Sequence, residues 1–338
     1  MMRMTLVAFI AGTLFTACKS GPAVPDVSGI KVELHVARFE KDLFSADTTD
    51  FAARLDKLQA RYPSFGENFL TTILNADPKW PADSTVAYVK GFMTAYRGLY
   101  DSSGIVFRDF SPYKQEIRQA LQFLKYYFPN YKAPHQIITY IGPVDGYGDI
   151  LTDDAIIVGL HQHLGKDYSL YQSGLVQETY PPYMSRRFTP EYISINCMKN
   201  IVLDMFPENM AEKPLVQQMV EKGKRLFLLS KLLPYKEEYL LIGYTKEQLK
   251  DVYAHEAQVW SLFTQNNLLQ SIDNNATKNY VSEGPKTPEL GEAAPGNIGS
   301  FAGWQIVKKY MDKNPGTTLL QLMAKDPEQL FQESKYKP

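Results

Sequence analysis

The stretch Ala155-Ile-Ile-Val-Gly-Leu160 is a short apolar run rich in β-branched residues, and it passes directly into His161-Gln-His163. A similar run, His135-Gln-Ile-Ile-Thr-Tyr-Ile141, precedes it and ends at a glycine and a proline. Runs of this length that stop at turn residues predict strands. Between them, Asp145-Gly-Tyr-Gly-Asp149 forms a turn that carries carboxylates but lacks the ligand spacing of a calcium-binding loop. The centre of the chain is therefore predicted to be a small sheet.

Helical patterns dominate on both sides of this centre. Before it, Val32, Leu34 and Val36 alternate with polar residues as in a strand, and three helical runs follow. After it, a short helical pair ends the chain, and four long helices precede that pair, at Thr189–Phe206, Leu215–Leu232, Thr245–Leu269 and Gly299–Met311. No internal repeat or linker interrupts residues 30–338. The sequence predicts one α+β domain, mainly helical with a small mixed sheet.

The charge balance argues against a nucleic-acid partner. The chain has 36 Lys and Arg against 37 Asp and Glu, so its net charge is −1, and the two signs are interspersed along the sequence. Only two cysteines occur, Cys18 and Cys197. Because lipid is expected on the first of them, as argued next, we expect a fold that does not depend on a disulfide.

The first residues indicate export. Residues 1–17 contain Arg3, an apolar run and then small residues, which is the order of a secretory signal peptide. Leu14-Phe-Thr-Ala-Cys18 resembles a lipobox, in which the cysteine is acylated and becomes the new N-terminus. We expect lipid on Cys18, a tether over residues 18–29, and attachment to a membrane. A plain signal peptide with an incidental cysteine is the alternative. The segment Lys19-Ser-Gly21 lacks an acidic cluster, which favours a periplasm-facing location.

The helix from Thr189 stands where a zinc peptidase of the zincin type carries His-Glu-x-x-His. That motif places two imidazoles one helical turn apart to bind zinc, with the glutamate beside them to activate water. The corresponding positions here are Asn196, Cys197 and Asn200. Because a neutral amide binds zinc poorly compared with imidazole, we predict a degenerate motif, no catalytic residue and no cofactor.

Two histidine patterns remain as weaker metal candidates. His161 and His163 would share one face of a strand, but the sequence identifies no third ligand for them. His255-Glu256 lacks the second histidine of the peptidase motif. A metal-dependent peptidase that uses His161, His163 and His255 is therefore the alternative to a non-catalytic protein.

Several short motifs are spread over the whole mature chain. They are Phe39-Glu-Lys-Asp-Leu-Phe44, Leu164-Gly-Lys-Asp-Tyr168 with Tyr171, Arg186-Arg-Phe-Thr-Pro-Glu-Tyr192, Pro295-Gly-Asn-Ile-Gly299, Gly303-Trp-Gln-Ile-Val307 with Tyr310, and Ser334-Lys-Tyr-Lys-Pro338. In order and spacing, and together with the lipobox, they resemble the gliding-motility lipoprotein family GldB of Bacteroidota. The pair His161 and His163 departs from the pattern of that family.

The resemblance implies a zincin-like, gluzincin-type scaffold with a degenerate metal motif, in a lipoprotein of the cell envelope linked to gliding motility. The implied partners are the membrane and other envelope or gliding-machinery proteins. From the residues alone, we expect a candidate pocket near the helix from Thr189, formed by Tyr183, Arg186, Arg187, His255, Glu256 and Trp304. The aromatic content of 13% leaves a third reading open, a lipid-anchored protein that binds a small ligand or glycan.

Replacing Cys18 with serine tests the lipid anchor. A chain without this thiol cannot be acylated, so we expect the Cys18→Ser protein to leave the membrane fraction and to take up no fatty-acid probe. Cell fractionation combined with metabolic labelling measures both properties. A variant that still fractionated with membranes and still carried the probe would contradict the assignment.

Overall fold

The computed structural model of the protein describes residues 24–45, 50–210 and 212–338, and Cys18 lies outside these ranges. Its sheet has the strand order β1-β2-β4-β3, where β1 is His35–Arg38, β2 is Gln136–Tyr140, β3 is Ile150–Leu151 and β4 is Ala155–Gly159. The first three strands in this order run parallel, whereas β3 is antiparallel to β4. The two central strands and the mixed sheet are confirmed.

Helices make up most of the remaining structure. The α-helices are α1 (Phe39–Phe44), α2 (Phe51–Arg61), α3 (Gly66–Asn68), α4 (Ala82–Ala95), α5 (Arg97–Val106), α6 (Ser111–Tyr127), α7 (Gly174–Thr179), α8 (Pro182–Ser185), α9 (Ile193–Met205), α10 (Leu215–Leu232), α11 (Glu238–Ile242), α12 (Lys246–Ala254), α13 (Glu256–Gln265), α14 (Asn274–Val281), α15 (Ile298–Lys313), α16 (Leu319–Ala324) and α17 (Pro327–Ser334). A π-helical turn, η1, covers Phe69–Ile73, and 3₁₀ turns cover Leu160–Gln162 (η2), Ser169–Gln172 (η3), Pro190–Tyr192 (η4) and Pro288–Leu290 (η5).

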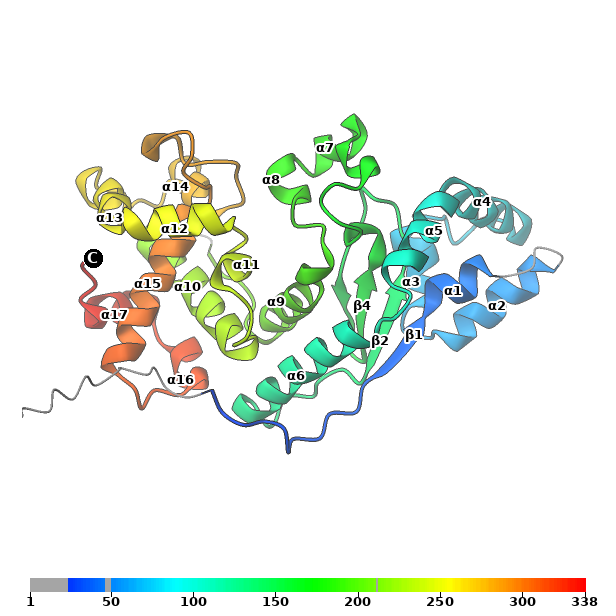
Figure 1. Cartoon of the computed structure of the whole chain (residues 1–338), viewed down its shortest axis with the longest axis horizontal. Coiled ribbons are helices and arrows are strands. Elements are labelled where there is room, and N and C mark those ends of the chain that lie inside the picture. The colour runs from blue at the N-terminus through cyan, green and yellow to red at the C-terminus, as the bar shows by residue number, and fades with distance from the viewer. Residues whose placement is uncertain (1–23, 46–49, 211) are drawn as a thin grey trace, which may run out of the picture.

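The C-terminal helices lie at one end of the molecule and helices α1 to α5 at the other, with the sheet between them (Figure 1). Helices α1 to α5 lie on one side of the sheet, and α6 and α9 lie on the other side, between the sheet and α10. Each strand of the central pair is buried over most or all of its length, because helices cover both of its faces. This arrangement places α9 beside the antiparallel edge strand β3.

Most of the predicted helices are confirmed with nearly the expected bounds. The 3₁₀ turn η4 and helix α9 together cover the helix expected from Thr189, and α10 has the predicted bounds. The long helix expected over 245–269 is instead two helices, α12 and α13. The break falls at His255, whose backbone leaves the helical conformation and whose Nδ1 lies 2.9 Å from the carbonyl oxygen of Asp251. The second helix therefore starts in a new direction.

The first strand begins later than its apolar alternation suggests. Residues 30–34 keep the alternating pattern, with Leu34 buried, but β1 starts only at His35. The reason is that β1 pairs with β2 only from His35 onward, and the preceding residues run along α6 instead. There the side chain of Gln122 donates to the carbonyl oxygen of Ile30, and Lys125 donates to that of Lys31.

Two glycines set the packing of the C-terminal helices. A Cβ atom added to Gly303 on α15 would overlap the carbonyl oxygen of Met219 on α10, and one added to Gly223 would overlap the carbonyl oxygen of Gly303. The two helix backbones therefore touch at this crossing, which only glycine permits. Trp304, next to this contact, is fully buried.

The described residues contain a complete core. Its buried apolar side chains extend from Val27, within the predicted tether, to Tyr336 near the C-terminus. A chain that starts at residue 19 therefore retains every one of these core side chains. Among the described residues, no helix combines the length and the apolar character that a membrane span requires.

Replacing Gly303 with alanine tests the close contact of α10 and α15. The added methyl group forces the two backbones apart, so we expect Gly303→Ala to lower the free energy of unfolding by about 3 kcal/mol. Gly91, an exposed helical glycine on α4 with open space around it, is the matched control. Gly91→Ala should raise stability by about 1 kcal/mol, because alanine favours helix over glycine. Urea unfolding measures both changes, and equal effects would exclude the proposed backbone contact.

Candidate functional site

A buried carboxylate, Asp149, joins the edge strand to the rest of the sheet and to α9. Its side chain is 3% exposed and accepts hydrogen bonds from three separate segments. The donors are the ring nitrogen Nε2 of His163 at 2.8 Å, the amide Nδ2 of Asn196 at 2.9 Å and the backbone N–H of Gly159 at 3.1 Å. A buried carboxylate with several donors is stable, whereas one without them is costly. Asp149 therefore fixes the start of β3 against β4 and α9.

His163 pairs with Asp149 as a cation. Its Nδ1 lies 3.1 Å from the carbonyl oxygen of Thr189, so both ring nitrogens face oxygen acceptors and both must carry a proton. Burial by itself lowers the pKa of His163, but the charge and the hydrogen bond of Asp149 oppose it, and the pKa is raised overall. A ring with two protonated nitrogens has no lone pair for a metal ion.

His161 has the opposite electrostatic state. The backbone N–H of Gly142 donates to its Nδ1 at 3.0 Å, which leaves Nε2 to donate to the carbonyl oxygen of Tyr147 at 2.9 Å. This is the neutral form, and burial lowers the pKa of His161 to about 4, although the hydrogen bond to Tyr147 acts in the other direction. The prediction that His161 and His163 share one face of a strand is wrong, because both lie after the end of β4. The 3₁₀ turn η2 after β4 directs them to different partners.

Side chains from the end of β2 and from the segment after β4 hold the acidic turn in place. Besides the bond from His161, Gln162 donates to the carbonyl oxygens of Val144 and Gly146, and Tyr140 donates to that of Gly148. The main-chain oxygens of this turn are thus hydrogen-bonded to side chains of the protein. Within the described ranges, no group of three or more His, Cys, Asp or Glu side chains is arranged to hold a metal ion.

The positions on α9 where a degenerate zinc motif was expected lie beside the edge strand. Asn196 donates to the carboxylate of Asp149, and Asn200 donates to its backbone carbonyl oxygen at 2.9 Å. Cys197 lies between them, is buried, and has a thiol whose pKa burial raises well above the ordinary value. The two amides and the thiol therefore take part in packing and in fixing β3.

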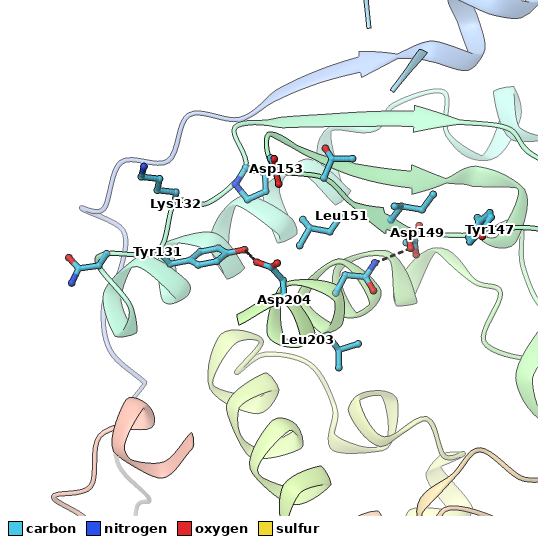
Figure 2. A pocket seen from close by; sticks show the side chains of 13 residues that line it. Tyr131, Lys132, Tyr147, Asp149, Leu151, Asp153, Leu203 and Asp204 are labelled. Atoms are coloured by element: carbon cyan, nitrogen blue, oxygen red, sulfur yellow. Dashed lines mark hydrogen bonds between the residues drawn. The ribbon is translucent and has the colours of Figure 1, made fainter. Parts of the chain in front are cut away.

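A groove of about 670 Å³ lies between β3 and α9. Figure 2 shows Asp149 and Leu151 along one side and Leu203 and Asp204 along the other. The hydroxyl of Tyr131 donates to Asp204 at 3.0 Å near one end of this groove. Its charged lining is acidic, and it consists of Asp149, Asp153 and Asp204 with one cation, Lys132.

The edge of β3 that faces the groove retains backbone groups for pairing. Thr152 donates its N–H to the carbonyl oxygen of Ala155 on β4. Residues of an antiparallel pair alternate between bonding the partner strand and pointing away from it. The N–H and C=O of Leu151 therefore point away from β4, towards the open side.

The six residues of the predicted pocket do not line one pocket in the described structure. Arg186 donates to the carbonyl oxygen of Gly243, and Arg187 forms an ion pair with Glu283 at 3.0 Å. Tyr183 is on α8, just before these two arginines in the chain. The other three residues have different surroundings: His255 is exposed at the break between α12 and α13, Glu256 accepts from Tyr336, and Trp304 on α15 is fully buried.

The role of Asp149 was not predicted from the sequence, where this residue was expected only in a turn. The available signal was one aspartate immediately before the short apolar pair Ile150-Leu151, but such a pair is too short to predict a strand. The groove residues Tyr131 and Asp204 gave no pattern at all, because the fold alone brings them together.

The buried neutral state of His161 predicts a pH dependence of stability. An unfolded histidine has a pKa of about 6.5, whereas the pKa of folded His161 is about 4. Between these two pH values the unfolded chain therefore binds a proton at this residue and the folded chain does not. The free energy of unfolding should fall by about 3 kcal/mol on this account between pH 7 and pH 4, and change no further below that. The raised pKa of His163 changes the free energy of unfolding in the opposite direction as the pH falls. This contribution is expected to be the same in the wild type and in a variant of His161.

His161→Gln isolates this contribution, because glutamine keeps a donor and an acceptor but does not titrate. Urea unfolding at both pH values should show a smaller loss of stability in the variant than in the wild type. Equal losses in the two proteins would mean that His161 is not held neutral.

The comparisons with known proteins identify the family. A family model described as gliding motility protein GldB matches residues 20–338, whereas no curated protein and no solved structure matches the chain. The matched range contains the sheet, α9 with Asn196 and Asn200, and all the motifs noted in the mature sequence. The chain therefore belongs to the gliding motility protein GldB family.

Proposed function

We propose that this chain is a non-catalytic, lipid-anchored protein of the bacterial cell envelope that serves gliding motility by binding another envelope component. The observation that supports this proposal most is the set of hydrogen bonds made by the polar residues of α9. At the positions where a zinc peptidase carries ligands, Asn196 and Asn200 donate their amide protons to Asp149. A zinc hydrolase needs about three protein ligands and an open position for water. The residues present do not fit such a centre.

The order of elements supports a zincin-like, gluzincin-type origin for this scaffold. Strands β2 and β4 precede a connecting segment and then the long helix α9, which is the layout of a peptidase with its reactive residues on the helix. The water-activating position holds Cys197, which is buried and whose raised pKa keeps it protonated at neutral pH. A thiol in that state cannot act as a general base.

The groove beside β3 is the proposed binding surface. Leu151 offers a backbone N–H and C=O at the edge of the sheet, and an extended segment of a partner can pair with such an edge. The carboxylates of Asp153 and Asp204 line the same groove and favour a partner segment with basic side chains. The lipid on Cys18 would keep this surface close to a membrane, in a periplasm-facing location.

A second candidate is the binding of a small ligand or glycan. A hollow of about 730 Å³ contains Tyr168, Tyr192, Tyr239 and Tyr244 together with Arg186. Aromatic rings beside a few polar groups are common in sites for sugars and small molecules. The groove at β3 remains the leading candidate, because it also offers unpaired backbone groups.

Site-specific crosslinking tests the groove. A photoreactive phenylalanine derivative in place of Tyr147, which lines the groove and is 56% exposed, should form a discrete adduct in cells of a gliding bacterium. The same residue in place of Tyr235, which is 68% exposed on another part of the surface, is the matched control and should form no such adduct.

Charge reversal sharpens this test. Asp153→Lys combined with Asp204→Lys should abolish the adduct from position 147, because a basic segment would then meet like charges. Equal adducts from positions 147 and 235, or an adduct that survives the charge reversal, would contradict a partner bound in this groove.

A further inference from the structure

A further cavity lies beside α9, next to the face of this helix that lines the groove at β3. Its volume is about 280 Å³, and it is bounded by α9, α10, α11 and the first turn of α15. Leu203 lines both this cavity and the groove at β3, so α9 forms the wall between the two.

One side of this cavity is an aliphatic wall. Val202 from α9, Leu226 and Leu229 from α10, and Leu241 and Ile242 from α11 supply it. Such a surface favours a hydrocarbon chain, since each buried methylene contributes about 0.8 kcal/mol. The volume is near the lower end of ligand pockets, so the chain has to be short.

The charges of the lining do not balance. Lys222 pairs with Glu208 at 2.9 Å, and Arg225 pairs with Glu221 on its own helix at 2.9 Å. Glu283, the second carboxylate of the lining, pairs with Arg187 at 3.0 Å. Among the contacts of the described residues, the ammonium group of Lys199 has no hydrogen bond or ion pair, so one cation is left without a partner.

The surroundings of Lys199 penalise its charge. The pKa of Lys199 is lowered to about 8, mainly by burial; the nearby cations Arg187 and Lys222 act in the same direction, whereas Glu283 opposes them. Lys199 is half-buried. An ammonium group in such a site gains from an anion that enters, because desolvation penalises a charge that has no partner.

The start of α15 adds a second attraction for an anion. Asn297, the residue before the helix, and Ser300 in its first turn both line the cavity. The first N–H groups of a helix have no partner within the helix, and this end carries a partial positive charge. Lys199 and the end of α15 thus contribute positive charge to one cavity, whose other lining residues are aliphatic side chains and charged side chains that already have partners.

We propose that this cavity binds a small anionic amphiphile, with its anionic group at Lys199 and the first turn of α15 and its alkyl chain along the leucine-rich wall. The ligand class is a medium-length aliphatic chain that ends in a carboxylate or phosphate. Free fatty acids and membrane lipids share this chemistry. The site requires no protein partner, so it is independent of the function proposed for the groove.

Calorimetric titration of the chain from residue 19 to 338 with octanoate at pH 7 tests the site. We expect saturable binding to one site, weakened about tenfold or more in Lys199→Met, because a charge-assisted hydrogen bond is lost. Lys250→Met, which removes an exposed lysine from α12, is the matched control and should bind as the wild type does. Leu226→Trp, which fills the cavity but keeps Lys199, should also abolish binding.

Further ligands separate the two halves of the proposal. Octanol lacks the charge and acetate lacks the chain, so each should bind about tenfold or more weakly than octanoate. Vesicles of phosphatidylglycerol that bind in a Lys199-dependent manner, in place of octanoate, would support a lipid source for the same chemistry. The proposal is overturned if neither octanoate nor the phosphatidylglycerol vesicles bind. It is also overturned if Lys199→Met and Leu226→Trp both bind octanoate like the wild type, or if acetate binds as tightly as octanoate.

Discussion

The carboxylate of Asp149 is the interaction on which the central part of the molecule depends. It is buried and receives donors from the segment after β4, from β4 itself and from α9, so it holds three elements with one side chain. His163 supplies the compensating positive charge at 2.8 Å. Since a buried carboxylate without donors is very costly, the position of β3 and the orientation of α9 are determined together.

The same interaction limits the chemistry of the site. A metal centre needs lone pairs that converge on one point, whereas here Asn196, Asn200 and His163 all present protons to Asp149. The ring of His161 uses its lone pair to accept from Gly142. With β3 fixed in this way, its outer edge and the carboxylates across the groove remain available for a partner.

Much of the fold could be predicted because its signals are local. The apolar runs of β2 and β4 and the periodic helices α9 and α10 lie within continuous stretches of sequence. The strand β3 has two residues and gives no such signal. The site could not be predicted, because the roles of Asp149, His161 and His163 depend on contacts between distant segments. Among the residues expected in a pocket, Trp304 is buried next to a helix crossing that Gly303 permits, and no local pattern in the sequence indicates that crossing.

Hydrogen bonds to Asp149 hold α9 against β3. If they replace a metal ion in this role, elemental analysis of the chain from residue 19 to 338, purified without chelator and assayed in parallel for peptide hydrolysis, should show it. We expect clearly less than one zinc per chain and no hydrolysis. One zinc per chain that survives extensive dialysis, together with peptide cleavage that a chelator abolishes, would contradict this expectation.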